Sequence, residues 1–375
     1  MSYTMEEYAR MLVDPVRGAK YFAAVRRSVK PDMVVADIGA GPGVLGIYAA
    51  TLGARRVFLV EPESSVNAAY ALAEENGVAD RVEVIRSTST SIELPERADV
   101  IVSDLRGVTP FHGHHLEAAA DMRRRLLAPG GVCIPRRDVV YSALVEDETL
   151  YARTVGAWSG VPHTMALASL TALSANGWYR ARATVEQMMS DPARFVTLDY
   201  DCPAPPLHAR WETHAMRDGT AHGLLLWFDT ALVPGIELSN SPSAPPALYG
   251  QAFFPFRPAF TLRRGDRLRI ELRAVLAGDD YAWSWMADDD AGHAARHTTL
   301  RSLPLDPAAL AARSDHFAPR RSEDGEIIAA LLGAADGRRT FGELARLLHD
   351  RFPERFATEQ GALDYASRLE DLWAR

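Results

Sequence analysis

Three glycines and two acids near the N-terminus have the residue types and spacing of a nucleoside-binding turn. Asp37 ends a short apolar run, and Gly39, Gly41 and Gly43 follow it directly. The apolar run predicts a buried strand, and residues 44–52 after the glycines predict a helix. Closely spaced glycines let the backbone turn sharply and approach a ligand at the N-terminus of that helix. The segment therefore predicts a nucleoside ligand at the end of a strand.

Residues 41–46 also fit the dinucleotide pattern GxGxxG, so the two acids decide between ligand classes. At its position Asp37 would repel the diphosphate of a dinucleotide, but it can contact the ammonium of a ligand that has an amino acid portion. Glu61 ends the apolar strand 57–60, close to the spacing at which a carboxylate receives ribose hydroxyls. The pair favours S-adenosylmethionine, with S-adenosylhomocysteine as product, over NAD. An ordinary α/β turn that binds no ligand is the third possibility.

The composition is that of a globular enzyme, and it excludes several other classes of protein. The chain has 375 residues, of which 47% are hydrophobic and 24% are charged, and a formal net charge of −8. This acidic balance argues against nucleic acid as a partner, because such binding relies on clustered Lys and Arg. Nothing resembles a membrane span or a secretory signal, so we expect a cytoplasmic protein without a membrane partner. Cys133 and Cys202 cannot build a disulfide framework or a zinc ribbon.

The pattern of elements changes along the chain. Strand and helix patterns alternate through the first third, which predicts a mostly parallel sheet. After residue 138, short β-like runs predict an antiparallel sheet or barrel. Residues 158–194 look helical and alanine-rich, with a Met188–Met189 pair that a single chain would expose and a dimer arm would bury. Three helical patterns follow a break at residues 303–321.

Several motifs, taken in order along the chain, resemble those of the protein arginine methyltransferase family over residues 5–275. Residues 11–21 look like the family's N-terminal helix, whose arginine, here Arg17, holds the cofactor carboxylate. Residues 103–107 resemble the start of its catalytic loop, and residues 238–242 resemble the barrel region around a second catalytic loop.

The resemblance implies a set of cofactor-binding residues around the glycine turn. Thr90 stands where the family binds the adenine with a glutamate. The residues expected to bind S-adenosylmethionine are Met11, Arg17, Asp37, Gly39, Gly41, Gly43, Leu45, Glu61, Pro62, Thr90 and Ser103.

The resemblance also implies the architecture. We expect an α/β fold: a Rossmann-like class I S-adenosylmethionine methyltransferase domain, then an antiparallel β-barrel domain with a helical dimerisation arm, then a small helical C-terminal module. The arm implies a homodimer. The expected boundaries are N-terminal helices at 1–30, the Rossmann-like domain at 31–137, the barrel domain at 138–302 with its arm at about 156–194, a linker at 303–321 and the C-terminal module at 322–375.

Departures from the family pattern fall at the site for the methyl acceptor. The family has two glutamates on the catalytic loop, and this chain has Asp104 and Gly113 at those positions. Residues 247–249, Ala-Leu-Tyr, replace the family's Thr-His-Trp. A guanidinium must be held by carboxylates in bidentate geometry, and Gly113 offers no side chain. These substitutions indicate a changed acceptor.

The altered loop supplies candidates for a base. Methyl transfer is an in-line displacement, so the protein has to position the acceptor and keep its lone pair free. A nearby base would lower the cost of deprotonating an alkyl amine, and histidine suits this task. The candidate catalytic residues are Asp104, His112, His114, His115 and Glu117. The His-x-His-His spacing does not place two ligands on one helical face, so we expect no metal.

Three functions remain open at this point. The first is methyl transfer to a nitrogen, with oxygen second, of a small-molecule natural product or a modified peptide. The second is methylation of protein arginine with a non-standard acidic clamp, and the third is a catalytically silent binding subunit. Residues 336–344 of the C-terminal module resemble the winged-helix domain that binds leader peptides in ribosomally made peptide natural products, which would indicate a peptide acceptor. A helical cap that stabilises the dimer is the alternative for this module.

Overall fold

The computed structural model describes residues 3–161, 165–304 and 306–369. The chain divides into two compact units, Met1–Pro304 and Leu305–Arg375. Parts of four expected segments lie outside the described residues, namely 1–2 of the N-terminal helices, 162–164 of the arm, 305 of the linker and 370–375 of the C-terminal module.

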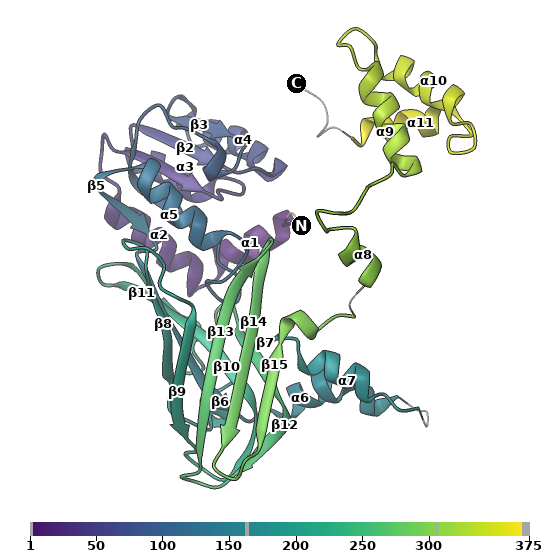
Figure 1. The fold of residues 1–375 in the computed structure, drawn as a ribbon. Helices are drawn as coiled ribbons and strands as arrows, with labels where there is room; N and C mark the ends of the chain where they lie inside the picture. The colour runs from purple at the N-terminus through teal and green to yellow at the C-terminus, as the bar shows by residue number, and fades with distance from the viewer. Residues whose placement is uncertain (1–2, 162–164, 305, 370–375) are drawn as a thin grey trace. The chain divides into compact units, whose positions relative to one another are not determined.

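A Rossmann-like parallel sheet forms the centre of the first third of the chain, as the alternating pattern predicted (Figure 1). The strand order is β3-β2-β1-β4-β5 and every pairing is parallel, so β1, β2 and β4 end side by side at one edge. Every residue of β1 is buried, as expected of a strand covered on both faces. The strands are β1 (Val34–Ile38), β2 (Arg56–Val60), β3 (Val82–Ile85), β4 (Ala98–Ser103) and β5 (Leu127–Ile134).

Helices connect these strands and precede them. Helix α1 begins with a capping box, in which Thr4 and Glu7 exchange hydrogen bonds and so satisfy backbone donors of the first turn. Helix α3 follows the glycine turn directly and contacts β1 and β2. The helical segments of this region are α1 (Met5–Val13), α2 (Arg17–Ser28), α3 (Val44–Thr51), η1 (Ser64–Asn67), α4 (Ala68–Glu75), η2 (Ala79–Arg81), η3 (Ser89–Ser91) and α5 (His115–Arg125).

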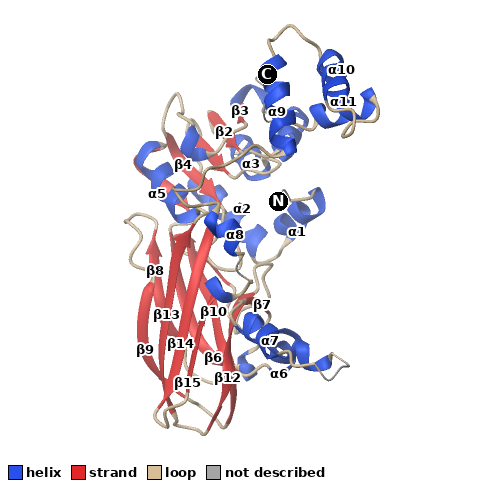
Figure 2. Cartoon of the chain, turned by 45° about the vertical axis from the view of Figure 1, so that its right-hand side comes forward, coloured by secondary structure: helices blue, strands red, loops and turns tan. Residues whose placement is uncertain are grey.

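Two antiparallel sheets occupy the region where the sequence predicted a barrel (Figure 2). One has the order β7-β12-β10-β6-β8, with β11 paired to β10, and the other has the order β15-β14-β13-β9. The strands are β6 (Arg137–Val145), β7 (Tyr179–Ala181), β8 (Ala193–Asp199), β9 (His208–His214), β10 (Gly219–Val233), β11 (Ile236–Ser239), β12 (Gln251–Leu262), β13 (Arg267–Ala277), β14 (Asp280–Asp289) and β15 (Ala294–Thr298).

The parallel and antiparallel regions share one continuous apolar core. Helix α2 contacts α3 on one side and β10 and β11 on the other. Phe111, in the loop that precedes α5, makes edge-on ring contacts with Phe195 of β8 and with Tyr281 and Trp283 of β14. Burial of an aromatic ring of this kind dominates local packing energy. The loop after β4 is therefore held by the antiparallel sheets as well as by its own strand.

The segment expected to be a helical arm is only partly helical, because β7 and the start of β8 interrupt it. The prediction that Met188 and Met189 are exposed in a single chain is wrong. Both side chains are buried. The Met189 amide donates to the Leu144 carbonyl at 2.8 Å, and Met188 forms an isolated bridge with Val145, so this segment runs beside β6. The remaining helical segments of the first unit are α6 (Glu148–Thr154), η4 (Val155–Gly160), α7 (Ala168–Ala175), η5 (Val185–Gln187) and η6 (Thr299–Arg301).

The second unit consists of helices around a small core of its own. Ser322, Thr340 and Thr358 each accept a backbone hydrogen bond at the start of a helix, which explains where these helices begin. Residues 306–369 include no strand, so this part lacks the β-strands of the winged-helix domain that it resembles. Its helices are α8 (Pro307–Ala311), α9 (Glu323–Ala334), α10 (Phe341–Arg351) and α11 (Glu359–Ser367). No helix in the described part of the chain is long and apolar enough to cross a bilayer.

Candidate active site

A cleft of about 230 Å³ opens at the edge where β1, β2 and β4 end, which is where ligands bind in open α/β sheets. Residues of α1, of the start of α2 and of the ends of these strands line the cleft. Six of the predicted cofactor residues line it, namely Met11, Arg17, Asp37, Gly39, Leu45 and Glu61.

The glycine turn has the backbone conformation that its sequence predicts. Gly39, Gly41 and Gly43 have φ values of 72°, 54° and 82°, in the left-handed region that favours glycine. A Cβ on Gly41 would lie 2.4 Å from the ring of Tyr8, so the missing side chain lets α1 approach the turn. The Gly41 amide donates to Glu61 Oε2 at 3.0 Å, which holds the second acid against the turn.

Asp37 is a buried carboxylate without an ion pair to any described Lys, Arg or His. Its Oδ2 accepts a hydrogen bond from the Gly46 amide at 2.8 Å. Burial raises the pKa of Asp37 to about 7, and the nearby Glu61 adds to this effect. A cation in the cleft would reverse the shift, so the site fits the ammonium of the methionine portion of S-adenosylmethionine.

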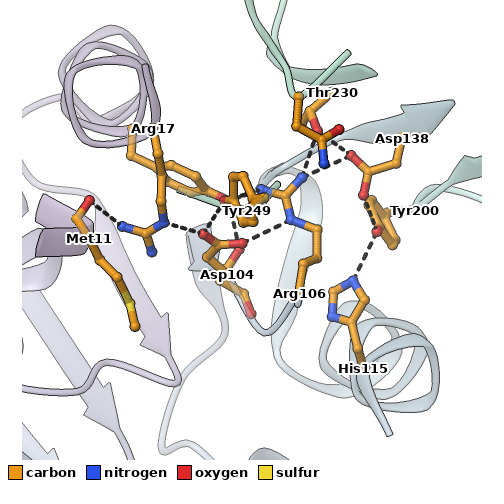
Figure 3. Close-up of polar contacts among 12 residues, drawn as sticks. Met11, Arg17, Asp104, Arg106, His115, Asp138, Tyr200, Thr230 and Tyr249 are labelled. Carbon is orange, nitrogen blue, oxygen red and sulfur yellow. Dashed lines mark hydrogen bonds and ion pairs between the residues drawn. The ribbon is translucent and has the colours of Figure 1, made fainter. Parts of the chain in front are cut away.

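Arg17 lines the same cleft as Asp37, and most of its guanidinium already bonds to its own chain (Figure 3). Its Nε donates to Asp104 Oδ2 at 2.7 Å, and its Nη1 donates to the Met11 carbonyl at 2.9 Å. The Asp14 side chain accepts hydrogen bonds from the amides of Val16 and Arg17, which fixes the start of α2. Nη2 makes no hydrogen bond to the described residues, so it remains able to bind the carboxylate of the cofactor.

The other predicted cofactor residues lie beside the cleft or away from it. Gly43 packs against Leu59 and Ala69, so its role is close contact between the turn and the sheet. The Pro62 carbonyl accepts from Arg86 Nε at 3.3 Å. Gly41 packs against the ring of Tyr8. Thr90 is exposed on η3, next to Thr88. The hydroxyl of Ser103 is buried and has no hydrogen-bond partner among the described residues.

Asp104, at the position of the first family glutamate, already has partners for both of its oxygens. Oδ1 accepts from Arg106 Nε at 2.9 Å, and Oδ2 accepts from Arg17 Nε and, at 2.6 Å, from the hydroxyl of Tyr249. Burial alone would raise the pKa of Asp104, but Arg106, Arg17 and the Tyr249 hydrogen bond hold it well below its usual range. The carboxylate is therefore ionised and engaged within the chain.

Arg106 is the centre of a buried network that joins the catalytic loop to the antiparallel sheet (Figure 3). Its Nη1 donates to Asp138 Oδ1 at 2.9 Å and to Thr230 Oγ1 at 2.7 Å. Its Nη2 donates to the hydroxyls of Tyr21 and Tyr249 at 2.7 Å and 3.2 Å. The guanidinium is fully buried and is bound on every side, which is the condition under which a buried charge is tolerated.

The candidate bases separate into two groups. His112 lines the cleft together with Asp104. His114 lies at the surface, where its ring bonds Glu117 at 2.5 Å and Asp279 at 3.4 Å. Gly113 has a φ of 48° and offers no side chain between them. Of the five candidates, Asp104 and His112 are the ones that line the cleft.

His115 does not line the cleft, and its ring lies in the network around Asp138 (Figure 3). Its Nε2 lies 2.9 Å from the Tyr200 hydroxyl, which donates to Asp138 Oδ2 at 2.6 Å. Because Tyr200 gives its one proton to Asp138, His115 donates from Nε2, and Nδ1 is left buried without a partner among the described residues. Burial, with Arg106 nearby, lowers the pKa of His115 to about 3. The ring is neutral and holds the network in place.

Arg106, Tyr249 and Tyr8 belong to the site, although the sequence alone did not single them out as functional residues. Tyr249 stands where the family has a tryptophan, so its hydroxyl was a visible signal. The Leu248 amide donates to Asp14 Oδ2 at 2.9 Å, and this bond brings Tyr249 to the catalytic loop. Arg106 follows Asp104 by two residues, and a cation so close to the expected clamp was the second signal.

A second pocket, of about 300 Å³, adjoins the cofactor cleft and shares five lining residues with it, namely Tyr3, Met11, Arg17, Asp104 and Arg106. We call it the acceptor-side pocket. Its further walls come from α1, from the loop after Arg106, from the β7 strand and from the loop before β12. They include Glu7, Arg10, Gly107, Val108, Arg180, Leu248 and Tyr249.

Comparison with known proteins agrees with this geometry. Residues 136–281 match the family model of the arginine methyltransferase oligomerization subdomain, and residues 21–107 match the model of ribosomal protein L11 methyltransferase. Protein arginine N-methyltransferase 6 of Danio rerio is 30% identical over 282 residues, which cover 71% of this chain and 80% of the relative. Protein arginine N-methyltransferase 1 of Schizosaccharomyces pombe is 27% identical over 274 residues, which cover 70% of this chain and 79% of the relative.

Solved structures show the same fold. The PRMT1 enzyme-prozyme complex of Trypanosoma brucei with AdoHcy aligns with a TM-score of 0.72 at 22% identity, covering 79% of this chain and 98% of that chain. Protein arginine methyltransferase 10 of Arabidopsis thaliana aligns with a TM-score of 0.68 at 21% identity and covers 79% and 98% in the same way. The relatives, the fold and the cleft together identify an S-adenosylmethionine-dependent methyltransferase, and the chain belongs to the protein arginine methyltransferase family.

Proposed function

We propose that this enzyme methylates a nitrogen, with oxygen as second choice, of a small molecule or modified peptide, and that its acceptor is not the guanidinium of arginine. The observation that carries the proposal is the occupied carboxylate of Asp104. Arg17, Arg106 and Tyr249 use both of its oxygens, so the chain's own guanidinium groups already bind the acid that an arginine substrate would need.

The charges of the acceptor-side pocket support the same conclusion. It is lined by four arginines and two carboxylates, so its net charge is positive. One carboxylate, Asp104, is engaged as described, and Glu7 accepts hydrogen bonds from the amide and hydroxyl of Thr4 at the start of α1. A guanidinium that entered this pocket would meet like charge, which disfavours binding. The arginines are Arg10, Arg17, Arg106 and Arg180.

The cleft also limits which residue can accept a proton. The cofactor supplies an electrophilic methyl group when bound, and the protein has to present a neutral nucleophile to it. Asp104 is a weak base because its neighbours hold its pKa low. His112 is the other candidate that lines the cleft, and imidazole is the side chain that ordinarily exchanges protons at neutral pH. We therefore assign proton acceptance to His112 and the orientation of the pocket to Asp104.

The enzyme can be tested with tritium-labelled S-adenosylmethionine. We expect label in amines of a small-molecule extract from the producing organism, and none in an arginine-rich peptide. His112→Gln should lower turnover by a larger factor than it lowers the affinity for S-adenosylhomocysteine, whereas His114→Gln, at the surface, should change neither. Methylarginine in the acid hydrolysate of the labelled peptide would contradict the proposal.

Methylation of protein arginine with a non-standard clamp is the second candidate. Two observations favour it: the relatives bear the name of arginine methyltransferases, and Glu7 and Asp104 line one pocket. In that case Glu7→Gln should abolish transfer to the arginine-rich peptide. If Glu7→Gln reduced only the transfer to the small-molecule fraction, that result would contradict this second candidate.

We also propose a homodimer. The match to the oligomerization subdomain over residues 136–281 supports it, as do Trp158 and Trp178, each 36% exposed on the segment around α7. Sedimentation equilibrium should give twice the chain mass, and Trp158→Ala with Trp178→Ala should weaken the association. A monomer at micromolar concentration would exclude this assembly.

A further inference from the structure

One cation of the acceptor-side pocket, Arg180, has no acidic partner in the part of the chain that the structure describes. Arg180 lies on the short strand β7, which pairs with β12 at the edge of its sheet. Arg17 and Arg106 form ion pairs with Asp104, and Arg10 forms one with Glu6. Among the ion pairs of residues 3–161, 165–304 and 306–369, none includes Arg180.

The guanidinium of Arg180 is positioned by the backbone beside the pocket. Its Nη2 donates to the carbonyl of Leu248, and Leu248 is itself fixed by its bond to Asp14. Because only one nitrogen is used in this way, the other donors of the planar group remain available. Partial burial lowers the pKa of Arg180, and Arg182 adds to this effect, although part of the side chain is exposed to solvent.

The neighbours of Arg180 give the pocket a definite chemistry. Tyr3, Met11 and Tyr249 supply apolar and aromatic surface, and Asp104 already belongs to Arg17 and Arg106. The pocket therefore offers one guanidinium without an ion pair among the described residues, next to apolar and aromatic side chains. Arginine binds a planar carboxylate in bidentate geometry, which specifies orientation as well as charge.

We propose that Arg180 is a specificity-determining residue that binds a carboxylate of the methyl acceptor. This inference rests on the proposed function, because it names the acceptor as a carboxylate-bearing amine or alcohol. The carboxylate pairs with Arg180 and turns the nucleophilic atom toward the side of the pocket that joins the cofactor cleft.

Three probes with one ring and different charges test the inference. They are para-fluorobenzoate, para-fluorobenzamide and para-fluorobenzamidine, titrated by fluorine NMR into the full-length enzyme saturated with S-adenosylhomocysteine. We expect the anion to bind tightest and the cation weakest. Arg180→Gln should weaken binding of the anion by about tenfold, to the level of the neutral amide.

Arg182→Gln is the matched control. Arg182 lies two residues further along the same chain segment, has the same charge and donates to the neighbouring Ala247 carbonyl at 3.3 Å, but it does not line the pocket. Its replacement should change binding of the anion by no more than about twofold, since it acts only through a screened field. Neither variant should change the affinity for S-adenosylhomocysteine, because neither residue lines the cofactor cleft.

Each contrary outcome has its own meaning. Equal binding of benzoate and benzamide, or no saturable binding of benzoate below about 50 mM, overturns the inference and leaves the proposed function standing. The same holds if benzoate binds tightest but Arg180→Gln leaves it unchanged. Tightest binding by benzamidine would show that the pocket selects a cation, and the proposed function would then fail together with the inference.

Discussion

The hydroxyl of Tyr249 donates a hydrogen bond to Asp104 Oδ2 at 2.6 Å. Tyr249 precedes β12 and Asp104 follows β4, so this bond joins the antiparallel sheet to the end of the parallel one. The same hydroxyl accepts a hydrogen bond from Arg106 Nη2 at 3.2 Å. Tyr249 therefore contacts both the Asp104 carboxylate and the buried Arg106 guanidinium. The tyrosine thereby ties the loop after β4 to the antiparallel sheet at the position where the chain lacks the family's second glutamate.

Tyr249→Phe should therefore lower both stability and turnover. The ring would keep its edge-on contact with Phe228, so the change removes the hydroxyl and little else. We expect the free energy of unfolding to fall by about 1–3 kcal/mol, because a buried carboxylate and a guanidinium each lose a partner. Urea unfolding followed by tryptophan fluorescence reports on the first unit, since all tryptophans except Trp373 precede residue 305.

Tyr48→Phe is the control for this measurement. Tyr48 contacts Phe22 in the same edge-on way, but no described residue hydrogen-bonds its hydroxyl. Its free energy of unfolding should stay within about 0.5 kcal/mol of wild type. An equal loss in both variants would mean that the hydroxyl of Tyr249 has no special role.

Arg106→Met should destabilise the enzyme more strongly. Removing the guanidinium leaves Asp104 and Asp138 as buried carboxylates without their shared cation. Breaking a buried pair from one side typically costs about 3–5 kcal/mol. The same urea experiment measures the loss. Arg55→Met, which breaks the exposed pair with Glu96, is the comparison and should change stability little.

Adding Asp138→Asn to Arg106→Met provides the decisive step for this network. If the guanidinium acts by neutralising Asp138, the double variant should recover part of the stability that Arg106→Met loses. If the stability losses of Arg106→Met and of Asp138→Asn alone simply add in the double variant, the two residues do not act as a unit.

The site shows which parts of such a structure a sequence can predict. Asp37 and Glu61 end neighbouring strands of a parallel sheet, so their spacing placed them at one edge, and the structure brings both to one cleft. Arg106 and Tyr249 lie far apart in the chain, and no local pattern indicates that folding joins them. Met188 and Met189 follow an apparent helical pattern, but pairing with β6 buries them, and that pairing is a long-range contact.

Adjacent residues can also have opposite environments that a sequence does not display. His114 and His115 stand at the start of α5, where one side chain faces solvent and the other faces the core. The first residue of a helix determines which face each position occupies, and helix boundaries are the least certain part of any pattern. The sequence therefore indicated a histidine cluster without indicating which member reaches the cleft.

The pH dependence of stability should reveal His115. Its pKa is about 3 in the folded protein against an ordinary value of 6.5, so the unfolded chain binds more protons between these values. Its contribution is complete above pH 6.5 and is lost as the pH falls toward 3. His115→Gln should reduce the slope of unfolding free energy against pH by up to about 1.4 kcal/mol per pH unit in this window.

His114→Gln is the matched control because the shift has the opposite sign. Hydrogen bonds to Glu117 and Asp279 raise the pKa of His114, so its folded form binds protons more readily than the unfolded chain. Its removal should leave the steep acid dependence of His115 intact. Identical pH profiles for the His115 variant and wild type would show that this imidazole is not held neutral by burial.

Binding of S-adenosylhomocysteine should release a proton near pH 6, and Asp37 is its expected source. The pKa of Asp37 is about 7 in the free protein, against 3.8 for an ordinary aspartate, because burial disfavours the charge. The folded protein therefore holds more protons than the unfolded chain between about pH 4 and 7, and this group's contribution to stability falls as the pH rises through that range. An ammonium beside the carboxylate favours its charged form and expels the proton.

Calorimetry in buffers of different ionisation enthalpy measures that release directly. At pH 6 the binding enthalpy should depend on the buffer with a slope of nearly one proton, and at pH 8 the dependence on Asp37 should disappear. Asp37→Asn should abolish the release at pH 6. Asp104→Asn should retain it, because Asp104 is already ionised in the free protein. A binding enthalpy that is independent of buffer at pH 6 would show that Asp37 is charged before the ligand arrives, and burial would then not control its protonation.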